Sequence, residues 1–533
     1  MLALLPAALL FLAALGIFLL QRLRPSVGWS WLIALVSTLI TAVGVILLRW
    51  RLPQQVAIEN WLPFSQFTDS PILGLDGNAW PYLFALSVVA LAIILTASAR
   101  LQYDISPYAW AGVLSLCAVG SLAVLAANLL TLILAWSLLD LIELVILQAN
   151  STHRSLGLQT VFAFAFRVTG TGLVMTAILF NAGQQAPPTF SSLNASSALL
   201  LLLAVGLRLG VLPLHLPAVQ GIILRRGLGT MLRMSAAASS LVVLGRLPAQ
   251  SIPPALAGPL QLLTALATLY AGIRWTTARD EIEGRPYWLI AFSGLAVSSV
   301  FRGNPQSSLV WGMALILPGS LIFLYSARRR QILWLPALAL LGYSGLPFTP
   351  VSGGWSGLLA PPFRFSHLLL IGAHACLLAG YARLILKPGD DLARMERWVQ
   401  VAYPAGLLIT VLALVFVGTL GLPVSPGMSF GWVGLLSSAV ACLGWLGALL
   451  WRQRVEVGTP LGQWYAETAR RLGMALEAFF NLKWFYQFLW WLYHRLMTFV
   501  DLLTQILEGA GGVLWTLVLL ALLISLLRTE LTP

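Results

Sequence analysis

The sequence has little charge and almost no lysine for its length. Of its 533 residues, 9% are charged and 59% are hydrophobic, whereas a soluble domain averages roughly 25% charged residues. Its length alone would suggest roughly two to four soluble domains, and this composition excludes them. The chain carries a net charge of +13, but its cations lie singly or in small groups between apolar segments. That distribution is typical of membrane topology signals and predicts no nucleic-acid partner.

Cysteine is also scarce. Cys117, Cys376 and Cys442 are widely spaced in apolar surroundings, which favours neither a disulfide framework nor a metal, iron–sulfur or haem site. We therefore expect no cofactor, no metal and no catalytic residue. The N-terminal apolar run has no basic residue before it, and Arg22 and Arg24 follow it. It is expected to remain in place as a membrane helix and not to be a cleaved signal peptide.

Long apolar runs fill most of the chain. Since a membrane helix needs about 20 apolar residues, we predict an all-α polytopic membrane protein with about sixteen spans. They are 3–21, 28–48, 81–100, 109–128, 129–148, 158–181, 198–222, 229–248, 257–274, 287–301, 309–326, 332–361, 366–386, 401–420, 430–451 and 510–528. Arginine is enriched in alternate loops, which predicts an N-terminus on the outer side of the membrane.

Two of these spans contain helix-breaking residues. Proline removes a backbone donor and clashes with the preceding turn, so each span is predicted to be discontinuous near mid-membrane; a simple kink is the alternative. One such helix in each half of a chain is typical of inverted-repeat transporters. The residues are Pro213, Pro217 and Gly221 in the first span and Pro347, Pro350 and Gly353 in the second.

Five local motifs resemble those of one family and follow its order. They are Leu75-Asp76-Gly77, AANLLTLILAWSLLDLIEL (126–144), AFAFRVTG (163–170), RLGVLPLHLP (208–217) and LALLGYSGLPFTP (338–350). On these motifs the chain resembles the large antiporter-like membrane subunits of respiratory complex I and of Mrp-type sodium/proton antiporters. The resemblance implies two inverted five-helix repeats, each with one discontinuous helix. It also implies a proton path made of a buried Glu–Lys pair and further central Lys or His residues.

The resemblance suggests five parts. Residues 1–108 would hold N-terminal helices and an outward loop, 109–248 the first repeat and 257–386 the second. Additional helices would follow at 401–451. Residues 455–533 combine aromatic and basic residues and then a last apolar run, which predicts an amphipathic stretch along the membrane interface and a final span.

The charged positions of the first repeat depart from the family pattern. The family's glutamate follows a tryptophan, but here Ser137 follows Trp136, and the carboxylates of this helix are Asp140 and Glu143. Because 137, 140 and 143 share one helical face, the acid has either moved along the helix, or both residues lie near the helix end and contact headgroups or a partner subunit.

Arginine replaces the family's titratable cations. Arg208 falls where the family has a central lysine, and Arg233 where one branch has a histidine. Arginine is not deprotonated in proteins, so Arg208 either pairs with Asp140 or Glu143 as a fixed charge or extends to the membrane surface. His215 matches a histidine of some members and is expected to serve in packing or hydrogen bonding more than as a relay.

The second repeat has fewer titratable groups. Trp355 and Ser356 stand where the family has Lys or Glu, and the chain's two lysines, Lys387 and Lys483, are not at family proton sites. His374 is the evident candidate for a relay here. The proton-path candidates are therefore Asp140, Glu143, Arg208, His215, Arg233 and His374.

These observations favour a membrane-arm subunit of a complex-I-type redox-driven proton translocase. It would be a non-redox subunit of an NADH (or other donor):quinone oxidoreductase, with reduced or no proton conduction of its own. The alternatives are a subunit of an Mrp-type cation/proton antiporter or of a bicarbonate-accumulating membrane complex, and a non-conducting structural membrane subunit. Expected partners are other membrane subunits and lipid, in a prokaryotic plasma membrane or a thylakoid membrane.

Overall fold

The structure is a computed structural model of the whole chain. It describes residues 2–24, 28–58, 70–100, 106–151, 154–182, 189–216, 224–249, 252–328, 330–359, 363–389, 391–422, 431–454, 467, 471, 483–508 and 512–529. The chain divides into two compact units, Met1–Arg454 and Val455–Pro533.

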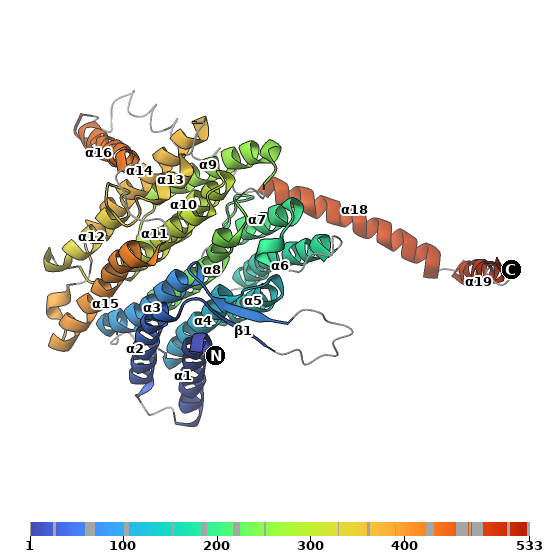
Figure 1. Cartoon of the computed structure of the whole chain (residues 1–533), viewed down its shortest axis with the longest axis horizontal. Helices are drawn as coiled ribbons and strands as arrows, with labels where there is room; N and C mark the ends of the chain where they lie inside the picture. The colour runs from blue at the N-terminus through green and yellow to red at the C-terminus, as the bar shows by residue number, and fades with distance from the viewer. Residues whose placement is uncertain are drawn as a thin grey trace. The chain divides into compact units, whose positions relative to one another are not determined.

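Helices make up nearly all of the described secondary structure (Figure 1). In the first unit they are α1 (Leu5–Leu23), α2 (Ser30–Leu48), α3 (Ala79–Thr96), α4 (Pro107–Leu125), α5 (Leu129–Ala149), α6 (Arg154–Ala182), α7 (Ala195–Leu209), α8 (Arg226–Arg246), α9 (Pro254–Thr277), α10 (Glu281–Phe301), α11 (Pro305–Leu324), α12 (Trp334–Tyr343), α13 (Gly354–Leu358), α14 (Phe365–Ile385), α15 (Arg397–Phe416) and α16 (Gly431–Arg454). The second unit has α18 (Lys483–Glu508) and α19 (Gly512–Thr529).

Among the described residues, 11 helices are long and apolar enough to span a membrane. The expected all-α polytopic membrane fold is thus confirmed, and the total of about sixteen spans stays a prediction. A two-stranded antiparallel sheet interrupts the segment expected to be an outward loop. It pairs β1 (Gln54–Ala57) with β2 (Ile72–Leu75).

Polar caps fix where several helices begin. Asn128 precedes α5, and its side-chain oxygen accepts a hydrogen bond from the backbone N–H of Thr131 at 2.9 Å. Asp280 precedes α10 and accepts from the N–H groups of Ile282 and Glu283, both at 2.8 Å. These caps satisfy N–H groups that have no partner within the helix. They set the starting points of two helices that carry buried charges.

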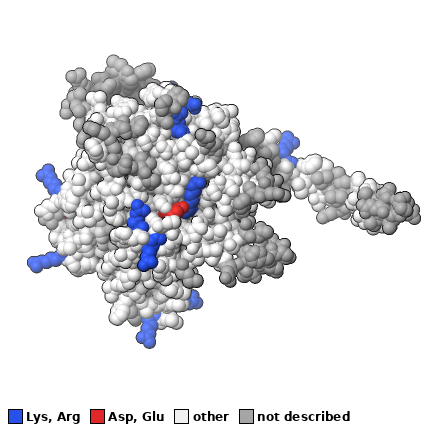
Figure 2. Space-filling view, viewed as in Figure 1, with Lys and Arg blue, Asp and Glu red and all other residues white. Residues whose placement is uncertain are grey.

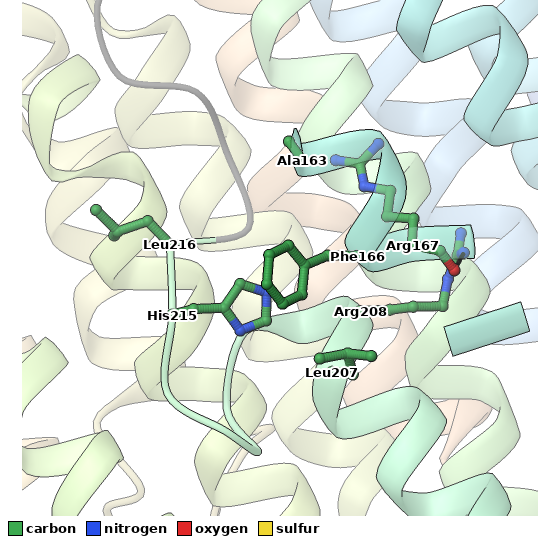
Figure 3. Close-up of a pocket in the computed structure, with 7 residues that line it drawn as sticks. All are labelled: Ala163, Phe166, Arg167, Leu207, Arg208, His215 and Leu216. Atoms are coloured by element: carbon green, nitrogen blue, oxygen red, sulfur yellow. Dashed lines mark hydrogen bonds between the residues drawn. The ribbon is translucent and has the colours of Figure 1, made fainter. Parts of the chain in front are cut away.

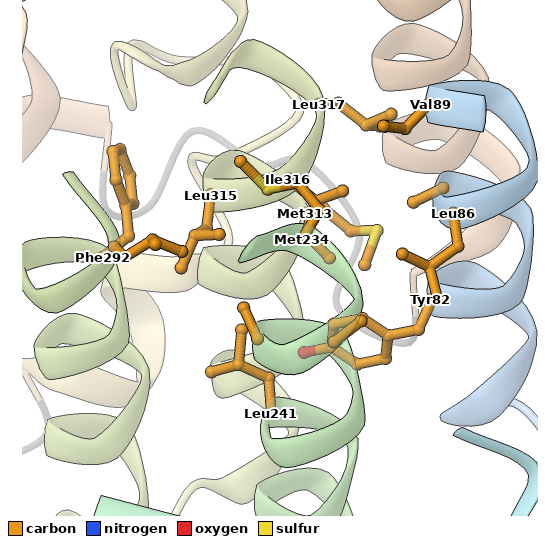
Figure 4. Packing of buried hydrophobic residues seen from close by; sticks show 14 of the residues in the cluster. Tyr82, Leu86, Val89, Met234, Leu241, Phe292, Met313, Leu315, Ile316 and Leu317 are labelled. Carbon is orange, nitrogen blue, oxygen red and sulfur yellow. The ribbon is translucent and has the colours of Figure 1, made fainter. Parts of the chain in front are cut away.

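The core of the first unit is centred on α11, whose membrane-spanning window is completely buried. It packs against α3, α8, α10 and α15. Figure 4 shows Met313 and Leu317 of α11 among side chains of α3, α8 and α10. Apolar packing on every side explains why this helix, unlike a peripheral one, is hydrophobic around its whole circumference.

Both proline-containing segments are non-helical. The helix α7 ends at Leu209, where Gly210 adopts the left-handed conformation with φ +75°, and an irregular segment follows through Pro213. Pro217 and Gly221 lie outside the described residues. In the second segment α12 ends at Tyr343, and turns containing Pro347, Pro350 and Gly353 lead to the short helix α13.

The second unit contains the stretch expected to follow the membrane interface. Its described part is mainly α18, a 26-residue helix rich in tryptophan, and α19. Arg471 and Glu467 form an exposed ion pair at 3.0 Å. Most of 455–482 lies outside the described residues, and the interfacial position of this stretch stays a prediction.

Candidate functional site

The two carboxylates of α5 point into the protein and not toward its surface. Asp140 is 2% exposed and Glu143 is 1% exposed. A position near headgroups, one of the two alternatives for these residues, does not match this burial. Because ionisable groups at membrane depth are costly unless paired, the partners of these carboxylates define the site.

Asp140 forms a bidentate ion pair with Arg208 of α7. Nη1 of Arg208 donates to Oδ2 at 2.6 Å, and Nη2 donates to Oδ1 at 2.7 Å. The guanidinium also lies over the ring of Trp136, 4.2 Å from its centroid. Parallel donors on a planar group match the carboxylate geometry, so Arg208 holds Asp140 in one orientation, one residue before the end of α7.

Glu143 is shared by two arginines. Arg167 of α6 bonds both of its carboxylate oxygens, with Nη2 at 2.5 Å from Oε1. Arg233 of α8 donates to the same Oε1 at 3.3 Å. Arg233 was a candidate on sequence, whereas Arg167 was not, although the motif AFAFRVTG contains it. The first-half charge cluster is defined as Asp140, Glu143, Arg167, Arg208 and Arg233.

His215 lies beside this cluster, in the segment that follows α7. Its Nδ1 is 2.9 Å from the carbonyl oxygen of Pro213, and its ring stacks on Phe166 at 5.0 Å between centroids. Figure 3 shows this stack next to Arg167 and Arg208. The pocket here has room for about one water molecule and is lined by Ala163, Phe166, Arg167, Leu207, Arg208, His215 and Leu216.

The region around the second irregular segment, between α12 and α13, is aromatic. His374 of α14 is fully buried, with ring centroids of Trp355 at 5.2 Å and Trp311 at 5.7 Å. Its Nε2 lies 3.2 Å from the carbonyl oxygen of Tyr343, and its Nδ1 lies 2.9 Å from the hydroxyl of Ser437. If Nε2–H donates to that carbonyl, a neutral imidazole accepts from Ser437 at Nδ1.

One further buried carboxylate, Glu281 at the start of α10, was not a candidate. It is bonded to Arg226 of α8 and to Arg328, which follows α11. In the sequence it belongs to a charged loop, and only the packing of three helix ends buries it. The described residues contain no group of three or more His, Cys, Asp or Glu side chains that could hold a metal ion.

Fixed charges dominate this arrangement. Each of Asp140, Glu143 and Glu281 bonds at least one arginine, and arginine keeps its proton. Figure 2 shows how little of the viewed face is charged, with acidic atoms next to basic ones near its middle. The paired charges produce a strong local electric field, but the arginines cannot transfer protons because they do not release them.

Comparison with known proteins supports the fold. No family model and no curated protein matches the sequence, but solved structures do. A chain of the membrane-bound sulfane sulfur reductase (MBS), an archaeal respiratory membrane complex, is 15% identical with a TM-score of 0.69, over 98% of this chain and 100% of that one. A chain of the Mrp complex from Dietzia sp. DQ12-45-1b is 14% identical with a TM-score of 0.67, over 99% of this chain and 63% of that one.

A chain of respiratory complex I from Thermus thermophilus, with bound aureothin, is 17% identical with a TM-score of 0.59. The match covers 79% of this chain and 100% of that one. At such identities the likeness concerns the fold. The chain has the fold of the membrane subunits of these complexes, which confirms the resemblance to antiporter-like subunits seen in the sequence motifs.

Proposed function

We propose that the chain is an antiporter-like membrane subunit of a complex-I-type, redox-driven proton translocase, and that it conducts no protons itself. The shared fold supports the first part of the proposal. The second part rests on one observation: Asp140 and Glu143, the buried carboxylates of the first half, are bonded to arginines. The loop distribution of arginine supports an N-terminus on the outer side of the membrane, and we place the chain in a prokaryotic plasma membrane or a thylakoid membrane.

Proton transfer through this cluster would be expensive. Protonating Asp140 would break a bidentate ion pair and leave Arg208 buried without a counter-charge, and uncompensated buried charges typically cost about 3–5 kcal/mol. Glu143 has the same difficulty with Arg167 and Arg233. A relay needs partners that gain and lose protons in turn, and arginine does neither.

The described residues of the second half support no alternative route, because Glu281 is bonded to two arginines and His374 is packed among rings. His374 is enclosed by Trp311, Tyr343 and Trp355, and its two ring nitrogens already have partners. In the first half α4 packs against α5 and α8, and in the second α9 packs against α10 and α14. This parallel supports two five-helix repeats, of which the second would be a packed scaffold.

The test is the proton-to-electron ratio of the intact complex. Asp140→Asn and Glu143→Gln are introduced together, and a second variant adds Arg208→Gln so that Arg208 is not left buried without Asp140. We expect an unchanged ratio in every variant that assembles, with subunit content checked separately. A loss on the order of one proton per turnover with normal assembly would show that the carboxylates carry protons, as intramembrane carboxylates commonly do.

An Mrp-type assembly is the second candidate. The similarity to the Dietzia Mrp chain extends over 99% of this chain. This similarity supports the Mrp-type candidate about as strongly as the other matches support the first candidate. Purification of the tagged chain from native membranes separates the two. Co-purification with quinone-reducing activity supports the first candidate, and sodium-dependent proton exchange in vesicles supports the second.

A further inference from the structure

A second group of buried charges lies at the N-terminal ends of α8 and α10. Glu281, 2% exposed, accepts from Arg226 and from Arg328, whose Nη2 is 3.2 Å from Oε2. Arg328 also donates to the carbonyl oxygen of Lys387, at 2.5 Å. The single carboxylate of Glu281 therefore already serves two guanidiniums.

Arg285 lies one turn further along α10 and is 5% exposed. Its Nε and Nη2 are buried and have no hydrogen-bond partner among the described residues. The guanidinium lies over the ring of Phe323, 5.1 Å from its centroid, and a Cβ on Gly229 of α8 would collide with Nη1. The packing thus fixes the guanidinium but leaves one of its edges without an acceptor.

The charges around Arg285 do not balance. Arg233 and Arg226 repel it, while Glu281 and the exposed Asp280 attract it. Glu281 is bonded to two other arginines, and Asp280 caps the start of α10. Charged groups inside a membrane protein are almost always paired. An excess of guanidinium charge in this region therefore calls for an anion that the described side chains do not supply.

We propose that the free edge of Arg285 binds one small inorganic anion of the size and charge of chloride. Nε–H and the adjacent Nη2–H point the same way and form a two-donor fork, which suits a single acceptor. The neighbouring Arg226 side chain is 29% exposed, so the aqueous phase reaches the rim of this group. Two donors are too few for a multiply charged anion. The site does not depend on whether the subunit conducts protons.

The experiment uses the assembled complex and measures its thermal unfolding midpoint in sodium chloride and in sodium gluconate of equal ionic strength. A ligand that binds only the folded state raises the midpoint in a saturable way. We expect this rise for the wild type, and for the control variant Arg279→Met, which removes an exposed arginine just before α10. Arg285→Met should abolish it. In gluconate Arg285→Met should be at least as stable as the wild type, because an unpaired buried charge has been removed.

Two further variants sharpen the result. Arg285→Lys keeps the charge without the fork, so roughly tenfold more chloride should be needed for half of the rise. Asp390 lies outside the described residues, and Asp390→Asn tests whether the chain supplies the anion itself. A chloride effect seen only in Asp390→Asn, or one that survives Arg285→Met, would overturn the proposal. So would equal wild-type midpoints in both salts.

Should Arg285→Met fail to assemble, wild-type crystals grown in bromide give the answer. An anomalous difference peak within hydrogen-bonding distance of Nε and Nη2 would support the site. Its absence at saturating bromide, with water in its place, would overturn the proposal without any variant.

Discussion

The first half, α4–α8, and the second half, α9–α14, differ in the side chains that surround their irregular segments. In the first half a carboxylate on α5 faces an arginine on the helix that precedes the irregular segment, Asp140 against Arg208. In the second half the irregular segment is packed by Trp311, Trp355 and His374. Ion pairs thus lie beside the irregular segment of the first half and stacked rings beside that of the second, whose buried ion pair, Glu281 with Arg328, lies at the start of α10.

The second half shows that an irregular segment can be enclosed by aromatic rings without an ion pair beside it. Aromatic rings bury large areas and need few polar partners, whereas buried ion pairs often contribute little net stability compared with apolar side chains of similar volume. In the proposed pair of repeats, the irregular segment of the second has aromatic rings where that of the first has ion pairs. The charges of the first half are therefore better explained by their electric field, or by the way they fix one helix register, than by stability.

Breaking one ion pair should have the largest effect on the stability of the complex. Arg208→Met leaves Asp140 buried without a counter-charge and should destabilise the complex by about 3–5 kcal/mol. The double variant Asp140→Leu/Arg208→Met removes both charges and should recover most of that loss. Both are measured as unfolding midpoints and as assembly yields. If the double variant were as unstable as the single one, the pair would contribute to stability in its own right.

Which of these features the sequence could reveal depends on whether they are local. Apolar runs predicted helices closely, as in 129–148 against α5, because burial in a membrane selects composition over a whole segment. Proline and glycine marked both irregular segments. The strands β1 and β2 were missed, since four residues each are too few for a periodic signal.

The ion-pair partners were only partly predictable. Sequence placed Asp140 and Arg208 as possible partners because a family motif aligned them. Arg167 and Glu281 were missed because the contacts of Arg167 with Glu143, and of Glu281 with Arg328, join separate helices. Their relative register is set by tertiary packing, which no single-sequence pattern records.

The second-largest loss of stability is expected for a change in the second half, α9–α14. His374→Ala removes a buried ring and its bonds to Tyr343 and Ser437, which should cost about 2–4 kcal/mol. Ser437→Ala, the matched control, should cost about 1 kcal/mol. Neither should alter the proton-to-electron ratio of assembled complex. A lower ratio in His374→Ala with intact assembly would contradict the scaffold role of this half.

A smaller effect tests how closely the charged half is packed. A Cβ on Gly170 of α6 would lie 3.0 Å from Cγ of Arg208 and 3.3 Å from the carbonyl oxygen of Ala204. Gly170→Ala should therefore cost about 1–3 kcal/mol by overpacking. Gly172→Ala is the control, because nothing lies within 4 Å of its Cβ position; it should stabilise the helix by about 0.5–1 kcal/mol. Equal effects of both changes on the unfolding midpoint would show that Arg208 is not held against α6.

The smallest effect is the difference in stability between variants of Trp311 and Trp355. Their rings lie at right angles, with centroids 5.0 Å apart. Nε1 of Trp311 donates to the carbonyl oxygen of Gly354 at 3.2 Å, whereas the buried Nε1 of Trp355 has no partner among the described residues. Trp311→Phe should cost at least about 1 kcal/mol because a buried acceptor loses its donor. Trp355→Phe loses ring area but also removes an unsatisfied N–H, and these two terms oppose each other. Paired unfolding midpoints should thus show the larger loss for Trp311→Phe. A larger loss for Trp355→Phe would mean that its indole N–H has a polar partner, such as water, and that the aromatic half is less dry than its packing indicates.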